Sequence, residues 1–311
     1  MHRFTINGTS EYYFVSNIGF YLMLFSTLFY YKSKRNAMGL YSRNIIFAAT
    51  KINKNLGIIT EILLFAIESL LAAYLISFAV GSFNRSFGEF IGTGANYFGM
   101  LLTVMFFWIV LSLLLMANPL KMLDISTMYL PIHLFFVKLS CYCAGCCWGI
   151  PWENGPYNYH PNHPGNQVPV QMIEAIWALL IFLFLLWYRK KAKVGTVFPI
   201  YMILYSATRF LSEFFRHEEN VLGPLKMYHI LCLIGIAYGI FHLVFLHFYR
   251  DTINEFFDNM NGKLDAKIAR YEADKVVRIK AEKEREETDR KVRAEKAKQN
   301  RAKAKARKNR L

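Results

Sequence analysis

The charged residues most able to do chemistry lie between Tyr205 and Arg216, inside an otherwise apolar part of the chain. Arg209 and Glu213 are four residues apart and can pair on one helical face, while Arg216 follows Arg209 by about two turns. Charges inside a membrane are costly and usually functional, and the planar guanidinium of Arg209 suits a phosphate. The pattern equally fits a structural Arg209–Glu213 pair with Arg216 extended to the lipid headgroups. The two interpretations are compatible.

A second polar pair, Gln171 and Glu174, follows Pro169 and precedes a run of fourteen apolar residues. The spacing of three places both side chains on the same helical face. One interpretation is a carboxylate favoured by the positive end of the helix dipole. The other is a hydrogen-bonding pair that orients a ligand in a water-filled cavity. Both stay open at this point.

Four of the five cysteines lie within seven residues. They are Cys141, Cys143, Cys146 and Cys147. Their thiolates could bind a metal, but no second pair lies elsewhere and the spacing matches no zinc ribbon. Packing of small apolar thiols is the favoured interpretation, so neither a metal nor a cofactor is expected. Gly145 and Gly149 would let another backbone or a ligand approach closely.

The elements that must position these groups are membrane spans. The chain of 311 residues is 54% hydrophobic, and its apolar runs approach the ~20 residues that cross a bilayer. A soluble fold is therefore excluded, and we predict an all-α, polytopic membrane protein with about seven transmembrane helices. The predicted spans are 13–31, 56–82, 90–117, 125–149, 170–188, 196–215 and 227–249. The fourth holds Pro131, His133 and Lys138, so we expect a half-buried or broken helix there.

The net charge of +15 is concentrated in alternate loops and at the C-terminus. Basic residues gather in the expected loop 32–54, in 189–193 and after 249, whereas 150–169 contains no Lys or Arg. This alternation predicts an outside N-terminus and a cytoplasmic C-terminus. The charge is therefore attributed to membrane topology, and no nucleic-acid partner is expected.

Two domains are predicted, a transmembrane domain at 1–250 and a basic tail at 251–311. The tail has no glycine or proline after Gly262 and is rich in Ala, Glu, Lys and Arg, which favours helix. Pairs such as Glu287 and Lys291 add a few tenths of a kcal/mol each. We expect a partly helical or disordered cytoplasmic tail near anionic lipid. A contact with a ribosome, RNA or another partner is the less favoured alternative.

Four motifs in order resemble those of the prolipoprotein diacylglyceryl transferase family. Tyr205-x3-Arg209-x3-Glu213-x2-Arg216 is similar to a motif in the family's penultimate span. The segment 141–149 is similar to its Ala-Gly-Cys-Cys-Tyr-Gly motif, Pro169-x-Gln171-x2-Glu174 to its His-Pro-x-Gln motif, and 92–100 to its glycine-rich third span. The resemblance covers about residues 12–249.

The resemblance implies a transferase that moves diacylglycerol from phosphatidylglycerol to the thiol of a lipobox cysteine in a prolipoprotein. A thioether forms and glycerol phosphate leaves, in a multi-pass protein of the bacterial cell membrane. It assigns catalysis to Arg209, Glu213 and Glu174. It assigns substrate binding to Arg216, Gln171, Lys138, Tyr205 and Tyr97.

Several positions depart from the family pattern. Its arginine before the cysteine motif falls on Lys138, which keeps the charge but loses the two-pronged hydrogen bonding. Its histidine before Pro169 falls on Val168, and its tyrosine before the glutamate falls on Ile173. His160 and His163 could supply lost polar groups, although a surface turn is favoured for them. The alternatives are a related membrane protein that uses another phospholipid, or a non-enzymatic scaffold that works through its tail.

Overall fold

The structure is a computed structural model that describes residues 11–33, 39–64, 67, 97–158, 164–217 and 220–308. The chain divides into two compact units, Met1–Phe257 and Asp258–Leu311. Helices dominate both units. Most of the predicted second span, Gly92, His160 and His163 lie outside the described residues.

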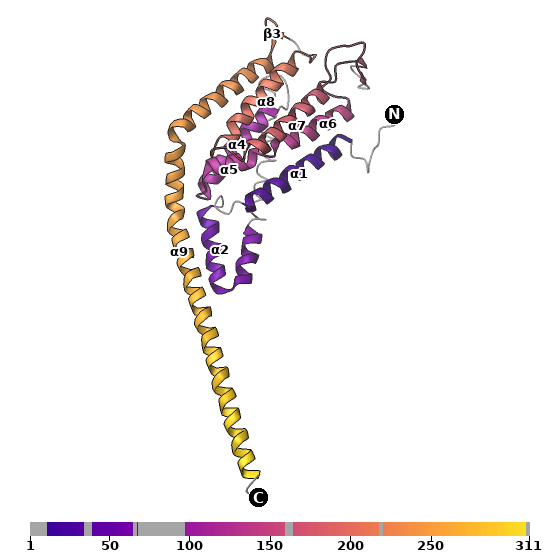
Figure 1. Cartoon of the computed structure of the whole chain (residues 1–311). Coiled ribbons are helices and arrows are strands. Elements are labelled where there is room, and N and C mark those ends of the chain that lie inside the picture. The colour runs from indigo at the N-terminus through magenta and orange to yellow at the C-terminus, as the bar shows by residue number, and fades with distance from the viewer. Residues whose placement is uncertain are drawn as a thin grey trace. The chain divides into compact units, whose positions relative to one another are not determined.

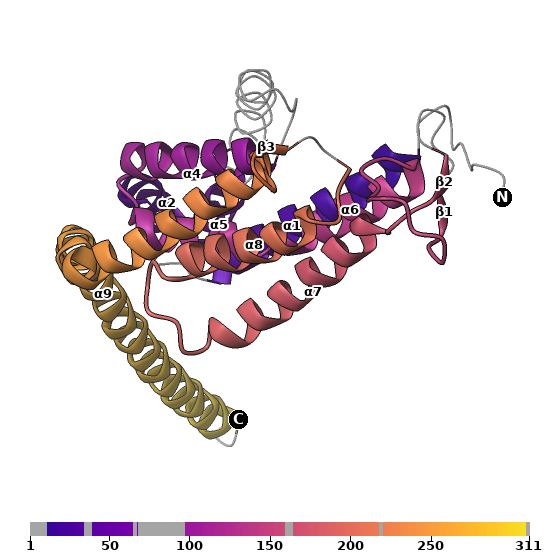
Figure 2. The same cartoon turned by 90° about the horizontal axis from the view of Figure 1, so that it is seen from above.

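The helices of the first unit form the frame of the site (Figure 1). They are α1 (Glu11–Ser33), α2 (Leu40–Ile52), α4 (Tyr97–Leu114), α5 (Pro119–Thr127), α6 (Leu130–Ala144), α7 (Val170–Tyr188), α8 (Val197–Glu213) and the start of α9 (Met227–Lys308). Two short antiparallel ribbons accompany them: β1 (Tyr157–Asn158) with β2 (Gly165–Asn166), and β3 (Asn220–Leu222) with β4 (Leu225–Lys226). Figure 2 shows α6 and α7 next to each other, with α1 and α8 packed at their sides.

Three helical stretches within the described residues are long and apolar enough to cross a membrane: Pro119–Ala144, Val170–Tyr188 and Met227–Lys296. The predicted span at 170–188 coincides with α7. Along α7 one face buries Glu174, Ile181 and Leu185, whereas the large apolar side chains of a second face are exposed. That face consists of Ile176, Leu180, Leu183 and Trp187. An apolar stripe of this kind suits lipid and is unfavourable in water.

The predicted fourth span, 125–149, is broken, as its composition indicated. A turn at 128–129 separates α5 from α6, and Pro131 stands in the first turn of α6, where a missing N–H costs little. The predicted C-terminal boundary at 149 is wrong. α6 ends at Gly145, which has the left-handed φ of 71° that favours glycine at a helix end. Cys146 and Cys147 therefore lie in a loop.

One further element differs from the prediction. Part of the basic stretch 32–54, expected as a loop, forms α2, because it lacks helix breakers and buries Phe47 while exposing Lys51. The helix that contains the predicted span 227–249 continues beyond it, since α9 runs from Met227 to Lys308. α9 contains no proline, and its glycines, Gly235, Gly239 and Gly262, are accommodated within the helix.

The core of the first unit lies between α4, α6, α7, α8 and the start of α9. Its largest fully buried side chains include Phe198, Tyr201, Leu101 and Leu185. Asp124 of α5 fixes the start of α8, because its carboxylate accepts hydrogen bonds from the Gly195 N–H at 2.6 Å and the Val197 N–H at 3.0 Å. The opposite end of α8 is left to carry the charged cluster.

Candidate active site

The charged cluster forms where the end of α6, the start of α7 and the end of α8 meet. Backbone pairing ties these ends together: Gly149 N–H donates to Val168 O at 3.0 Å, and Ile150 N–H donates to Phe215 O at 2.8 Å. Val168 N–H in turn donates to Ile150 O at 3.0 Å, so that residues 149–150 lie between the other two strands of backbone. The chain after the cysteines thus fixes both the Glu174 end of α7 and the Arg216 end of α8.

The backbone segments around position 149 lie so close together that only a glycine fits there. A Cβ at this position would lie 2.4 Å from Phe215 O and 2.8 Å from Val168 O. Neither backbone segment can move away without breaking the pairing of Gly149 with Arg216 or with Val168. The small residue predicted to let another backbone approach does so here.

Glu174 is the centre of the cluster. Its carboxylate accepts from Lys138 Nζ at 2.5 Å, from Arg216 NH2 at 3.1 Å, and from Arg209 NH1. Ser212 Oγ adds a hydrogen bond at 3.1 Å. Glu174 is 6% exposed, so this carboxylate is buried and its negative charge is balanced by cations from α6 and from the α8 end.

Glu213 is the second carboxylate of the cluster. The predicted i,i+4 pair is confirmed, since Arg209 NH2 lies 2.8 Å from Glu213 Oε2. Arg209 therefore spans both carboxylates, with one nitrogen on each, and its guanidinium also stacks 4.6 Å from the ring centre of Tyr228. Only a planar, forked cation can make this set of contacts.

Arg216 does not extend outward to the lipid headgroups. It is 8% exposed and its side chain turns inward to Glu174. The interpretation that Arg216 extends to the lipid headgroups is therefore wrong. Burial opposes its charge, yet the facing Glu174 carboxylate holds the pKa of this guanidinium above its ordinary value. Arg216 is therefore a cation at every physiological pH.

Lys226 is a functional candidate that the sequence pattern did not single out. Its Nζ donates to Glu213 O at 2.8 Å and also to Arg216 O at 2.5 Å, which secures the last residue of α8 and the turn that follows it. Lys226 is buried. Its position close to an apolar span marks this lysine as a candidate. The spacing does not predict which groups it contacts.

A small cleft opens beside the cluster. Its charged wall consists of Lys138, Glu174 and Arg209, and Tyr205 and Thr208 add hydroxyl groups. The remaining lining side chains are apolar: Leu134, Trp177, Ala178 and Ile181. The cleft therefore presents a polar end and an apolar side, which is the arrangement that an amphiphilic ligand requires.

The other predicted site residues occupy the margins. Gln171 donates to Cys146 O, and its Oε1 has no hydrogen-bond partner among the described residues, although the side chain is fully buried. Tyr97 and Tyr201 share a hydroxyl–hydroxyl hydrogen bond of 2.5 Å, and the Tyr97 ring packs on Tyr205 at 4.7 Å. Tyr97 supports the cleft wall through Tyr205 and does not line the cleft itself.

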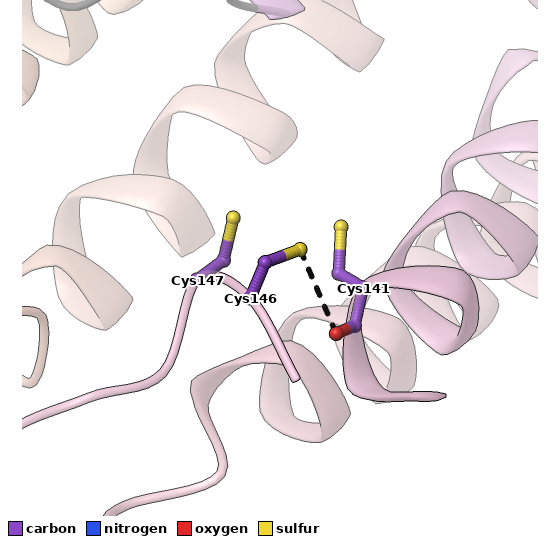
Figure 3. A group of neighbouring side chains, drawn as sticks. All are labelled: Cys141, Cys146 and Cys147. Atoms are coloured by element: carbon purple, nitrogen blue, oxygen red, sulfur yellow. Dashed lines mark hydrogen bonds between the residues drawn. The ribbon is translucent and has the colours of Figure 1, made fainter. Parts of the chain in front are cut away.

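Three of the clustered cysteines converge next to this network (Figure 3). The sulfur atoms of Cys141, Cys146 and Cys147 all lie within 4.8 Å of one another. Cys143 is exposed and does not belong to the group. Sequence spacing alone did not show which cysteines meet, because the turn at Gly145 decides it.

Comparisons with known proteins place the chain in a family. The sequence model of prolipoprotein diacylglyceryl transferase matches residues 13–245. A phosphatidylglycerol–prolipoprotein diacylglyceryl transferase of Clostridium tetani is 34% identical over 131 residues, which are 40% of this chain and 53% of that protein.

Enzymes of the same name show similar identity over shorter segments. That of Clostridioides difficile is 42% identical over 79 residues, 25% of this chain and 32% of its own. That of Idiomarina loihiensis is 31% identical over 115 residues, 33% of this chain and 40% of its own. The chain thus matches about half or less of the length of these curated relatives. Because the family match extends over most of the chain, this protein belongs to the prolipoprotein diacylglyceryl transferase family.

Proposed function

We propose that this protein is a phosphatidylglycerol–prolipoprotein diacylglyceryl transferase. It would move the diacylglyceryl group of phosphatidylglycerol to the thiol of a lipobox cysteine, form a thioether and release glycerol phosphate. The family membership and the printed names of the relatives support this activity. The single observation that carries it is the buried, cation-rich cluster that forms one wall of a cleft whose other side is apolar.

The formal charge of the cluster favours an anionic ligand. Among the residues that the structure describes, four buried or nearly buried cations, Lys138, Arg209, Arg216 and Lys226, gather around two carboxylates. Uncompensated positive charge is costly in a low-dielectric interior. A lipid phosphate at the charged wall would supply the missing negative charge, and its acyl chains would lie along the apolar wall.

The same cations suit the chemistry. The acceptor sulfur attacks a glyceryl carbon, and the bond from that carbon to the phosphate oxygen breaks, so negative charge grows on the leaving phosphate. We assign stabilisation of that charge to Arg209 and Arg216, with Lys138 at the substrate-binding margin. Because Glu174 and Glu213 each hold the forked guanidinium of Arg209, we assign them to fixing its position. Gln171, Tyr205 and Tyr97 would shape the substrate site.

The arrangement in the membrane is part of the proposal. We infer seven spans, an outside N-terminus and a cytoplasmic C-terminus in the bacterial cell membrane, supported by alternating basic loops and by three long apolar helices. We also infer a catalytic domain at 1–250 and a tail at 251–311. The tail would lie near anionic lipid, since its last part is almost purely basic.

The test is transfer by the purified full-length protein. Vesicles that contain phosphatidylglycerol and a synthetic lipobox peptide are incubated with the protein, and the peptide is weighed by mass spectrometry. We expect the mass of a diacylglyceryl group to be added by the unchanged protein and not by Arg209→Ala. The matched control is Arg290→Ala in the exposed tail, which should transfer normally.

Thermal unfolding of each preparation in detergent is the check that the Arg209→Ala variant is folded. Lipid binding without peptide modification by the unchanged protein would replace the proposal with another lipid-dependent function. Loss of cellular function on deletion of 263–311, together with normal function of Arg209→Ala, would point to a scaffold.

A further inference from the structure

The three converging cysteines have a geometry that packing does not explain. Cys141 is buried on the last turn of α6, whereas Cys147 is exposed in the loop that follows. Small thiols that merely fill a core are expected to be buried. Figure 3 shows instead three sulfur atoms gathered on one side of the α6 end, although they come from different backbone elements.

The backbone is shaped to bring them there. Gly145 adopts a left-handed conformation, and the chain folds back so that Cys146 N–H donates to Cys141 O at 3.1 Å. Cys147 itself has a φ of 62°, which is unfavourable for a residue with a Cβ. Such strain persists where the surroundings impose it, and it is concentrated at functional sites. Here the conformation places the third sulfur beside the other two.

The donor set defines the ligand. Three sulfur atoms select a soft, thiophilic cation over magnesium or calcium. In a tetrahedral zinc site the Zn–S distance of about 2.3 Å places the sulfur atoms roughly 3.8 Å apart. The present group needs only a small contraction from its limit of 4.8 Å, which side-chain rotation can supply. Three protein ligands also leave one of the four positions available, as in reactive rather than structural zinc sites.

The site is joined to the charged cluster. The carbonyl of Cys146 accepts from Gln171, which is three residues before Glu174 on α7. Gly149, two residues after Cys147, forms a backbone bridge with Arg216. The cations of the charged cluster would offset the net negative charge of a complex between one zinc ion and three thiolates.

We propose that Cys141, Cys146 and Cys147 bind one zinc ion, whose fourth position takes the thiol of the acceptor cysteine. This second part rests on the proposed transferase function. On coordination the acceptor thiol loses its proton to solvent. Its sulfur electron pair then forms the bond to the glyceryl carbon, and the pair of the breaking C–O bond leaves on the phosphate oxygen of glycerol phosphate. The product thioether is a weaker ligand than a thiolate and departs, so the zinc ion is unchanged.

The first experiment measures the metal. Full-length protein is purified in detergent under a non-thiol reductant, incubated with zinc, dialysed and analysed by mass spectrometry of the elements. We expect one zinc ion per chain, full occupancy in Cys143→Ser, and loss in Cys146→Ser and Cys147→Ser. Equal loss in Cys143→Ser, or no retained zinc in the unchanged protein, would overturn the site. A mass lower by two hydrogen atoms that persists under the reductant would show a disulfide between two of the cysteines. That result would also overturn the zinc site.

The second experiment tests whether the acceptor thiol coordinates the metal, and it does not depend on transfer activity. Cobalt(II) replaces zinc, and its sulfur-to-metal absorption is followed while a lipobox peptide is added. We expect the peptide to change this absorption and its cysteine-to-serine analogue to leave it unchanged. Removal of zinc with a chelator should slow transfer by about tenfold or more, because a neutral thiol is a poor nucleophile, and added zinc should restore it.

The outcomes separate the two proposals. Transfer that is unaffected by the chelator, together with a cobalt spectrum that ignores the peptide, would overturn the zinc proposal and leave the transferase intact. A cobalt spectrum that responds to the peptide in a protein that transfers no lipid would overturn the transferase and keep the thiol-binding zinc site.

Discussion

The end of α8 and the tail after Asp258 use the same local pattern with opposite results. In both, basic and acidic residues recur four apart on a helix: Arg209 with Glu213 in the first, Glu287 with Lys291 in the second. The α8 pair is almost fully buried, whereas both tail residues are exposed. The spacing alone therefore does not distinguish a site from a solvated surface.

The difference between the two regions lies in the charged partners that other helices contribute. Arg209 also contacts Glu174 of α7, and that carboxylate holds Lys138 of α6. Charges in water gain little from pairing, whereas a buried charge depends strongly on each partner. Removing a partner should therefore be severe in the cluster and nearly silent in the tail, and the substitutions below test this contrast from the largest effect to the smallest.

The largest effect is expected from Glu174→Gln. The change leaves Lys138, Arg209 and Arg216 without their shared carboxylate, although side-chain size is kept. We expect the free energy of unfolding to fall by about 3–5 kcal/mol and transfer to be lost. Thermal unfolding in detergent and the peptide assay measure the two effects. Glu287→Gln is the tail control, and equal stability of the two variants would refute the contrast.

Arg209→Lys should have the next largest effect on transfer. The charge remains, but a single ammonium cannot hold Glu174 and Glu213 at the same time in the present geometry. We expect transfer to fall by about a hundredfold, in line with the loss of one positioned donor, with a smaller loss of stability than in Glu174→Gln. Arg290→Lys in the tail should change neither. An Arg209→Lys protein with normal transfer would show that charge alone suffices.

Much of this could be predicted from the sequence because it is local. The apolar run after Pro169 ends at a basic stretch, so α7 was predicted at its observed boundaries. The Arg209–Glu213 pair follows from a spacing of four. The break after α5 was indicated by Pro131.

The contacts that make the site are not local. The bond from Lys138 to Glu174 and those from Lys226 to the end of α8 join residues whose distance depends on how whole helices pack. Family resemblance drew attention to Lys138, but nothing in the spacing pointed to Lys226. α2 was missed because its basic residues were interpreted as a loop, although the half-buried Arg43 and the exposed Lys51 belong to a short helix.

Gly149→Ala tests whether the backbone bridge holds the cluster together. The added Cβ would lie 2.4 Å from Phe215 O, so the segments at 149 and 216 must separate. Overpacking of this kind costs about 1–3 kcal/mol, and displacement of Arg216 should also slow transfer. Thermal unfolding and the peptide assay measure both effects.

Gly262→Ala is the matched control for that variant. No atom lies within 4 Å of a Cβ at Gly262, and alanine favours helix over glycine by about 0.5–1 kcal/mol. Circular dichroism should therefore show an unchanged or slightly more stable tail helix. A Gly149→Ala variant that behaves like Gly262→Ala would remove the bridge from the account of the site.

The smallest effect is expected from Glu287→Lys in the tail. The reversal replaces an attractive i,i+4 pair with Lys291 by a repulsive one, yet both side chains are exposed to solvent, which screens them. We expect a slight loss of helical circular dichroism at low ionic strength that disappears in high salt, and unchanged transfer. The corresponding losses in Glu174→Gln should persist in high salt, because ions do not reach buried charges. Loss of transfer in Glu287→Lys would mean that the tail takes part in the reaction, and the division between a buried site and a solvated helix would then have to be redrawn.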